Sequence, residues 1–295
     1  MRTLKLGLAL GAGGTKGAAH VGVMRVLADA GVTPEIIAGT SIGSLYGACV
    51  AAGRTPHEIE DGIRTCPDRD VYTFFRQRLK LRANNRLARR FYEALAGLHI
   101  EDLPVAYAAV ASDIQRREPV VITAGPLIDA IEASIAIPLI ARPVAHQGRY
   151  LLDGGFWDAA PVDAAHQLGA DVIVAVEIAR PYSMPERLRT SAVRAASMLD
   201  RIPLGRTLAG IPFTIRAVSG TLRETRTAQV VLRPRTRGLL RNSPARMIDC
   251  LEAGIAAAED ALPAIKALLA GESPMVVAQE FAPEGDLLAT EPGIA

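Results

Sequence analysis

Cysteine is scarce in this 295-residue chain. Its three cysteines, Cys49, Cys66 and Cys250, are widely spaced, and none of them belongs to a Cys-x-x-Cys pair. A disulfide framework or a cysteine-based zinc site is therefore not expected, and a reducing compartment, the cytoplasm, fits this composition best. No other grouping of metal-ligating residues stands out, so we expect neither a metal ion nor another cofactor.

The sequence also lacks long apolar runs and internal repeats. Because no stretch of about 18 apolar residues occurs, no membrane-spanning helix is predicted. Arg2 and Lys5 flank the apolar residues Leu4 to Leu10, an arrangement that faintly resembles a signal peptide. The run is short, is interrupted by Lys5 and leads directly into glycines, so we interpret it as a first β-strand.

An excess of charge of one sign is missing as well. Lys plus Arg number 33 against 31 Asp plus Glu, which gives a formal net charge of +2. This near-neutral average excludes a strongly basic nucleic-acid binder, and no nucleic-acid partner is expected. The hydrophobic content of 49% excludes a disordered chain, because ample apolar surface is available to offset chain entropy.

What the sequence does contain is a repeated order of apolar run, glycine turn and helix. Leu4 to Leu10 precede a glycine-rich turn and a helix over Lys16 to Ala30, and Ile36 to Ala38 precede a second turn and a helix over Ser44 to Ala52. This alternation is typical of an α/β fold with a parallel sheet. Further strands are predicted at 105–111, 120–123, 150–152, 172–178 and 230–232, and further helices at 126–133, 161–168 and 247–269, the last interrupted by Pro263.

The first candidate site is the loop Gly11-Ala12-Gly13-Gly14-Thr15-Lys16-Gly17. A dinucleotide-binding fingerprint that begins at Gly11 needs glycine where Lys16 stands, and a phosphate loop needs a terminal Gly-Lys-Ser/Thr that is absent. Small residues at a helix N-terminus still expose successive backbone N–H groups, which favour negative charge such as an oxyanion formed during acyl transfer. The alternative is a tight structural turn without chemistry.

The second candidate site is Gly39-Thr40-Ser41-Ile42-Gly43, a Gly-x-Ser-x-Gly pattern between an apolar run and a helix. This is the context that a nucleophile elbow requires. Gly39 and Gly43 permit the tight turn that exposes the Ser41 hydroxyl, and the helix dipole favours the developing alkoxide. Ser41 is therefore the candidate nucleophile.

Asp153, in Leu152-Asp153-Gly154-Gly155, is the candidate general base. A carboxylate at the end of an apolar run lies at the sheet edge where α/β sites gather, and desolvation there raises its pKa toward a useful range. The alternative is an Asp-Gly-Gly turn without chemistry.

A histidine base is the other option. Asp153 or Asp163 with His166 satisfies the Ser, Asp, His order of α/β-hydrolases. However, Ser41 follows only the second predicted strand, and His166 lies inside a helical stretch. We therefore expect the histidines to be core or surface residues; the others are His20, His57, His99 and His146.

Taken together, these segments resemble the patatin-like phospholipase family. Gly11 to Gly17 is similar to that family's oxyanion loop, Gly39 to Gly43 to its nucleophile elbow, and Asp153-Gly154-Gly155 to its Asp-Gly-Gly/Ala motif. The order and spacing agree, as do intervening pieces such as Ala133-Ser134-Ile135-Ala136-Ile137-Pro138. The resemblance is good from about Leu6 to Ile178.

The resemblance implies a three-layer α/β/α sandwich with a mainly parallel central sheet, and a catalytic core over residues 6–168. Residues 169–270 are expected to complete the same domain, and 271–295, rich in Pro, Glu and Gly, to form a loosely ordered tail. The implied chemistry is lipid acyl hydrolysis by a Ser41–Asp153 dyad through an acyl-enzyme intermediate. Backbone N–H groups of Gly13 and Gly14 would form the oxyanion hole, and Lys16 would hold the loop.

Two positions depart from the family pattern. Ala12 stands where many members have glycine. Asp158-Ala159-Ala160 stands before Pro161-Val162, where the family often has asparagines. The second departure affects the packing expected around the dyad and leaves both catalytic residues intact.

The near-neutral total charge hides local excesses. Residues 76–90 carry seven basic residues and no acidic one, with five of the chain's 13 aromatics beside them. The seven are Arg76, Arg78, Lys80, Arg82, Arg86, Arg89 and Arg90. This composition suits peripheral contact with an anionic membrane, or else an ordinary solvated helix face. A second basic stretch, 180–241, suits phospholipid headgroups, a protein partner or RNA.

Three function classes follow. The favoured one is a lipid acyl hydrolase that acts on carboxylic esters of phospholipids or related lipids. The second is a soluble esterase or thioesterase that uses the same dyad on non-membrane acyl substrates. The third is a non-catalytic basic membrane-binding module, against which the intact Ser41, Asp153 and glycine loop argue.

Overall fold

The computed structural model describes residues 4–67, 70, 81, 86–113, 115–116, 118–137, 141–178, 227–236, 244–272 and 277–279. Several sequence predictions lie outside these residues. They concern Arg76, Arg78, Lys80 and Arg82, most of the basic stretch 180–241, and most of the tail after 271.

The described strands form one mixed sheet. They are β1 (Leu6–Leu10), β2 (Ile36–Thr40), β3 (Ala106–Asp113), β4 (Glu118–Ile122), β5 (Val144–His146), β6 (Arg149–Asp153), β7 (Val172–Val176), β8 (Val230–Leu232) and β9 (Val277–Ala278). Their order is β5-β6-β3-β2-β1-β7-β8-β9, with β4 paired to β3. Every pairing from β3 through β2, β1, β7 and β8 to β9 is parallel, whereas β4, β5 and β6 pair antiparallel. The predicted mainly parallel sheet is confirmed.

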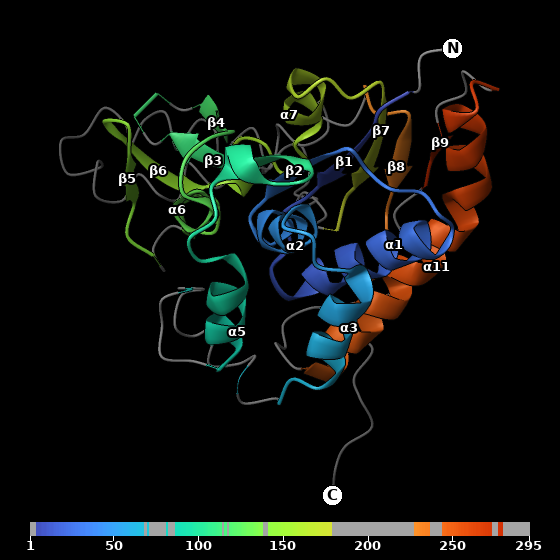
Figure 1. Cartoon of the computed structure of the whole chain (residues 1–295), viewed down its shortest axis with the longest axis horizontal. Helices are drawn as coiled ribbons and strands as arrows, with labels where there is room; N and C mark the ends of the chain where they lie inside the picture. Colours follow the sequence, from blue (N-terminus) through green and yellow to red (C-terminus); the bar gives the residue numbers. More distant parts are fainter. Residues whose placement is uncertain are drawn as a thin grey trace, which may run out of the picture.

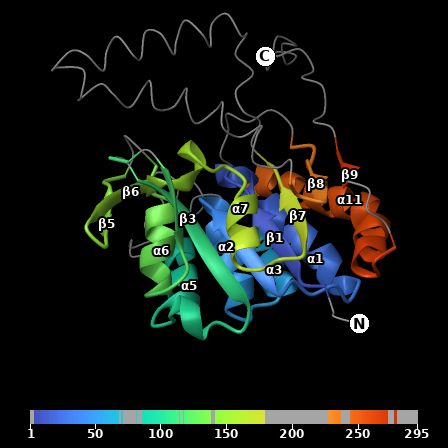
Figure 2. The same cartoon turned by 90° about the horizontal axis from the view of Figure 1, so that it is seen from above.

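Helices cover both faces of this sheet. The described helices are α1 (Ala18–Asp29), α2 (Ile42–Ala51), α3 (Pro56–Arg64), α5 (Arg86–Leu95), α6 (Leu127–Ser134), α7 (Val162–Gln167) and α11 (Pro244–Leu269). Short 3-10 turns are η1 (Gly14–Gly17), η2 (Ile100–Asp102) and η3 (Gly154–Phe156). Figure 1 shows α1, α2, α3 and α11 on one side of the strands and α7 on the other, and Figure 2 shows α7 crossing over them. The three-layer α/β/α arrangement is therefore confirmed.

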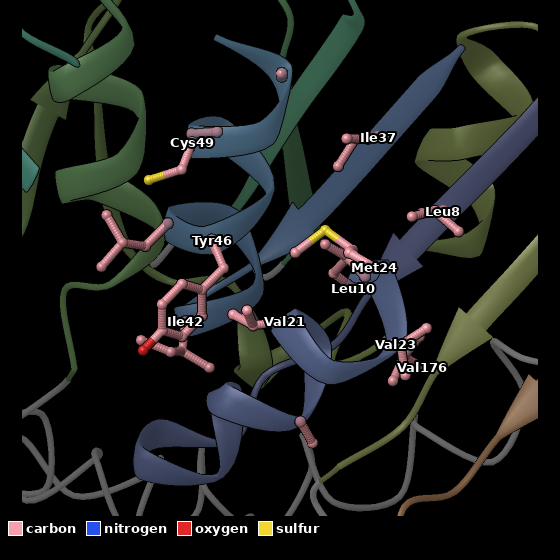
Figure 3. Close-up of a cluster of buried hydrophobic side chains, with 14 of the residues drawn as sticks. Leu8, Leu10, Val21, Val23, Met24, Ile37, Ile42, Tyr46, Cys49 and Val176 are labelled. Atoms are coloured by element: carbon pink, nitrogen blue, oxygen red, sulfur yellow. The ribbon is translucent and has the colours of Figure 1, made fainter. Parts of the chain in front are cut away.

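The alternation of side chains along β1 explains the two unequal faces. Leu6, Leu8 and Leu10 are buried in the larger core with α1 and α2, and Figure 3 shows Leu10 next to Met24 of α1. Gly7 and Ala9 point to the opposite face, where Ala9 packs with the small side chains of α7. Because successive strand residues point to opposite faces, five residues of β1 build both layers.

The register along β3 fixes the position of the site. One edge of β3 pairs with β4 at positions 109–113, so the partners β2 and β6 both occupy the other edge. There β2 ends at Thr40, opposite Val110, and β6 runs in the opposite direction and ends at Asp153, opposite Ala111. The two strands therefore meet head to head, and the residues at their ends become neighbours.

The structure also contains elements that the sequence did not predict. α3, α5, the short strand β5 and the edge strand β9 are among them. β9 lies within the segment expected to be a loosely ordered tail, where it pairs with β8. α11 continues through Pro263. The proline has no N–H to donate to the carbonyl of Glu259, but both residues lie on the exposed side of the helix, where water can bond that carbonyl.

Within the described part of the chain, no helix has the length and apolar character needed to span a membrane.

Candidate active site

Ser41 lies at the turn between β2 and α2 in a strained backbone conformation. Its φ of 55° and ψ of −124° fall in a region that residues other than glycine rarely adopt. A side chain on Gly39 would overlap the backbone of Ser44, and one on Gly43 would overlap the carbonyl of Leu10. Only glycine fits at these two positions flanking Ser41, which is why the Gly-x-Ser-x-Gly pattern occurs here.

The side chain of Ser41 donates a hydrogen bond to Asp153. The Oγ–Oδ2 distance is 2.5 Å, and both residues are only 5% exposed. The second carboxylate oxygen, Oδ1, accepts the backbone N–H of Gly155 at 2.8 Å. Each oxygen of Asp153 thus has a fixed partner, and the carboxylate is aimed at the Ser41 hydroxyl.

Burial sets the proton affinity of Asp153. Desolvation raises its pKa from 3.8 to about 6, against the opposing effect of the hydrogen bonds from Ser41 and Gly155. A carboxylate with this pKa is ionised at neutral pH and is a stronger proton acceptor than an exposed aspartate. These are the properties that a general base needs.

Close packing requires a glycine at position 154 and leaves little room for a side chain at position 155. A side chain on Gly154 would overlap the carbonyl of Val110 on β3, and the Cβ of one on Gly155 would come within 3.0 Å of the Cβ of Ala12. The Asp-Gly-Gly segment therefore contacts both the sheet and the glycine loop. Ala12, the first departure from the family pattern, lies at this contact.

The glycine loop packs against the elbow and against residues 159–176. Gly11 donates a backbone hydrogen bond to Val176 at 3.1 Å, and Ala12 donates one to Ala159 at 2.8 Å. A side chain on Gly17 would overlap Ile42, the first residue of α2. The loop is thus held beside the N-terminus of the helix that follows Ser41.

Gly13 and Gly14 form the bend of this loop. Gly14 has a φ of 58°, and a side chain on Gly13 would come within 2.6 Å of Ile178. Among the described residues, the N–H groups of Gly13 and Gly14 donate to no other group. Two N–H groups without an internal partner, next to a helix N-terminus, are suited to an anionic oxygen.

Lys16 lies in η1, with its backbone N–H donating to the carbonyl of Gly13 at 3.3 Å. The charge of its ammonium affects Cys250 of α11. Burial raises the pKa of the Cys250 thiol to about 11, and the positive charge of Lys16 opposes that rise. The charge of Lys16 is therefore close enough to Cys250 of α11 to affect its thiol, and the backbone N–H of Lys16 closes the turn at Gly13.

His20, which the sequence assigns to the core or the surface, is fully buried in α1. Its Nε2 lies 2.7 Å from the carbonyl oxygen of Gly11. Because that oxygen can only accept, Nε2 carries the proton. Burial lowers the His20 pKa to about 4, so the ring is neutral at pH 7. His20 thus fixes the start of the glycine loop rather than acting as a base.

None of the histidines bonds Ser41 in the part of the chain that the structure describes. His166 is exposed on α7, while His57 and His99 lie near Asp29 and Glu101 at the surface. The hydrogen bond that the Ser41 hydroxyl makes goes to Asp153. The geometry therefore favours the carboxylate over the Ser, Asp, His alternative.

Ser134 contacts the elbow, and sequence reasoning missed this contact. Its Oγ accepts the backbone N–H of Ser41 at 2.9 Å and donates to the carbonyl of Val110 at 2.7 Å. Ser134 is fully buried at the end of α6. It connects the strained turn to β3. A lone hydroxyl in the apolar stretch Ala133 to Ile137 is the signal that indicates such a role.

Asp158, the second departure from the family pattern, packs behind the elbow. Its backbone carbonyl accepts the hydroxyl of Thr40 at 2.9 Å. Burial, followed by the charge of Asp163, raises the pKa of the Asp158 carboxyl to about 7. A second buried carboxyl with a raised pKa therefore lies close to the dyad.

Of the seven basic residues between 76 and 90, the structure describes Arg86, Arg89 and Arg90. All three are exposed on α5, while Leu87 and Leu95 of the same helix are buried. α5 is thus an amphipathic surface helix with a basic outer face.

Comparison with known proteins identifies relatives of this chain. It is 34% identical over 187 residues to an uncharacterised NTE family protein of Mycobacterium tuberculosis, covering 62% of this chain and 51% of that protein. It is 32% identical over 180 residues to lysophospholipase nte1 of Aspergillus fumigatus, covering 59% of this chain and 12% of that protein. The chain therefore spans about half the length of the mycobacterial relative and a small part of the fungal one.

Among solved structures, VipD from Legionella pneumophila is similar in fold. The TM-score is 0.50 at 15% sequence identity, and the similarity covers 90% of this chain and 67% of that one.

The sequence profile of the patatin-like phospholipase family matches residues 8–166, more than half of the chain. This range includes the glycine loop, the elbow and Asp153. The structure brings these three segments together at one edge of the sheet. The chain belongs to the patatin-like phospholipase family.

Proposed function

We propose that this protein is a serine acyl hydrolase that cleaves carboxylic ester bonds of phospholipids or related lipids. The observation that carries the proposal is the buried hydrogen bond of 2.5 Å from Ser41 to Asp153, at the meeting point of β2 and β6. Family membership and the name of the fungal relative, a lysophospholipase, support a lipid substrate.

In the proposed mechanism, Asp153 accepts the proton of the Ser41 hydroxyl as its oxygen attacks the ester carbonyl. The carbonyl oxygen becomes an oxyanion, which the N–H groups of Gly13 and Gly14 stabilise. The bond to the alcohol breaks, and Asp153 returns the proton to the leaving oxygen. Water then attacks the acyl-enzyme with Asp153 again as base, and releases the carboxylic acid and free Ser41.

A second candidate function is a soluble esterase or thioesterase that uses the same dyad. No feature of the described site distinguishes a membrane lipid from a dispersed ester. Interfacial activation separates the two functions: a lipid hydrolase gains activity when its substrate forms aggregates, whereas a soluble esterase does not.

Replacing either dyad residue tests the mechanism. Ser41→Ala removes the nucleophile, and ester hydrolysis is expected to fall by more than about 10³-fold. Asp153→Asn removes the base but keeps the shape, and a loss of about 10²- to 10⁴-fold is expected. Both variants are assayed by hydrolysis of a short-chain nitrophenyl ester and by labelling with a fluorophosphonate probe. Wild-type labelling and turnover in either variant would refute the dyad.

The pH dependence follows from the raised pKa of Asp153. Asp153 accepts a proton only when ionised, so kcat/KM is expected to fall about tenfold per pH unit below about pH 6 and to be flat above it. Asp158→Asn is the matched control, because it removes the other nearby carboxyl with a raised pKa. An acidic limb near pH 4, or one that disappears in Asp158→Asn, would contradict the assignment to Asp153.

Ser134→Ala tests the support of the elbow. The change leaves the N–H of Ser41 and the carbonyl of Val110 without this partner, and a loss of about 1–3 kcal/mol in unfolding free energy is expected. The rate of fluorophosphonate labelling is expected to fall at least about tenfold, because Ser41 is no longer held in place. Tyr107→Phe is the control, because it removes a buried hydroxyl that bonds the carbonyl of Ser44 rather than Ser41. Equal labelling rates in both variants would assign Ser134 a purely structural role.

We further propose that the basic residues of 76–90 contact an anionic membrane, which the exposure of Arg86, Arg89 and Arg90 supports. Each such residue near a charged surface contributes on the order of 1 kcal/mol. Co-sedimentation with phosphatidylglycerol-containing vesicles is expected to weaken with salt and in the triple Gln variant of these arginines, and to persist in Arg54→Gln. Co-sedimentation that does not change with salt concentration or with anionic lipid content would rule this contact out.

A further inference from the structure

A cavity of about 310 Å³ lies among α2, α3, α5 and α11, separate from the dyad. Its lining includes Tyr46 and Cys49 of α2 but neither Ser41 nor Asp153. Figure 3 shows both side chains projecting from α2. They stand about 8 and 12 Å along the helix from Ser41. The cavity thus shares a helix with the nucleophile without being part of the reacting centre.

The interior of the cavity is apolar and uncharged. α3 contributes Ile59, Gly62 and Ile63 from one face, and α5 contributes Leu87 and Phe91. Burial raises the pKa values of the Tyr46 phenol and the Cys49 thiol, the latter to about 12, so both groups are neutral at pH 7. A polar ligand would lose its hydrogen bonds to water on entering such a space, whereas a hydrocarbon would be stabilised by leaving water.

The size of the cavity restricts the occupant further. Ligand cavities have volumes of roughly 300–1,000 Å³, so this one lies at the small end of the range. It suits one hydrocarbon chain rather than the two chains of a diacyl lipid. Met247 of α11 and Cys49 add soft, adaptable surfaces that accept chains of different length.

One unmatched charge stands at the edge of the cavity. Glu58 is held by the backbone N–H of Thr55 at 2.8 Å and lies 3.7 Å from Arg54, and Glu93 pairs with Arg89 at 2.7 Å. Arg90, which also lines the cavity and is exposed, has no ion pair within the described chain. A guanidinium in this position matches a carboxylate or a similar anion.

We propose that this cavity binds the hydrocarbon chain of a medium-chain fatty acid, whose carboxylate pairs with Arg90. The site is additional to the dyad, and its occupant need not be a substrate. Binding to a protein that lacks the nucleophile tests it independently of the hydrolase function.

The first arm of the experiment titrates Ser41→Ala protein with fatty acids of six to twelve carbons by calorimetry. One molecule is expected to bind per chain, and the affinity is expected to rise about fourfold per added methylene until the cavity is full. Decyltrimethylammonium, which has the same chain length as decanoate but the opposite charge, is expected to bind at least tenfold more weakly.

The second arm fills the cavity. A Cβ on Gly62 meets nothing within 4 Å, so alanine is accommodated there, and a leucine side chain is expected to extend into the cavity that Gly62 lines. Both residues favour the helical conformation over glycine. In the Ser41→Ala background, Gly62→Leu is expected to weaken decanoate binding at least tenfold, whereas Gly62→Ala leaves it unchanged. Thermal unfolding of both variants checks that the fold is intact.

The third arm tests the charge. Arg90→Gln is expected to weaken decanoate binding about five- to tenfold and to leave decanol binding unchanged, whereas Arg89→Gln, its neighbour paired with Glu93, changes neither. Absence of decanoate binding to Ser41→Ala protein overturns the proposal. Equal decanoate binding by Gly62→Leu and Gly62→Ala also overturns it, because the ligand then lies elsewhere. Equal effects of Arg89→Gln and Arg90→Gln on decanoate binding overturn it as well.

Discussion

The candidate site depends on one edge of β3, where β2 and β6 meet end to end. A strand residue has two neighbours in a sheet, and β4 already occupies the opposite edge of β3. β2 and β6 must therefore share the other edge of β3. The register places Thr40 opposite Val110 and Asp153 opposite Ala111. Ser41 and Asp153 are 112 positions apart in the chain, yet this pairing makes them hydrogen-bonded neighbours. Gly154 is tied to the same edge, because only glycine fits beside the carbonyl of Val110.

The same edge stabilises a conformation that is unfavourable in isolation. A positive φ at a residue other than glycine costs on the order of 1–3 kcal/mol, which the surroundings of Ser41 must offset. Ser134 of α6, which is itself bonded to Val110 of β3, does so by accepting the N–H of Ser41, and Ser44 donates to the carbonyl of Ser41 at 2.6 Å. Burial destabilises the ionised carboxylate of Asp153. It therefore increases the affinity of this carboxylate for the serine proton. The strain at Ser41 and the desolvation of Asp153 both follow from the closeness of the two strand ends.

Much of the fold and the two residues that meet in the candidate site could be predicted because their signals are local. Apolar runs that end in glycine mark β1 and β2, and Ser41 and Asp153 stand at such ends. α3 also carries a local signal, the capping box of Thr55 and Glu58 with Pro56 at the first turn, which composition and periodicity alone did not bring out. The roles of Ser134 and His20 could not be predicted in this way. Each depends on a contact set by sheet register or helix packing, and a serine or histidine in an apolar stretch does not specify its partner.

Locating the acyl group during turnover tests the proposed role of Ser41 most directly. Rapid acid quenching of the reaction with a slowly deacylating ester, followed by digestion and mass spectrometry, identifies the modified residue. One acyl adduct is expected on Ser41, within the segment between Arg25 and Arg54, and none is expected in Ser41→Ala protein. Turnover with Ser41 unmodified, or an adduct on another residue that persists in Ser41→Ala protein, would contradict this role.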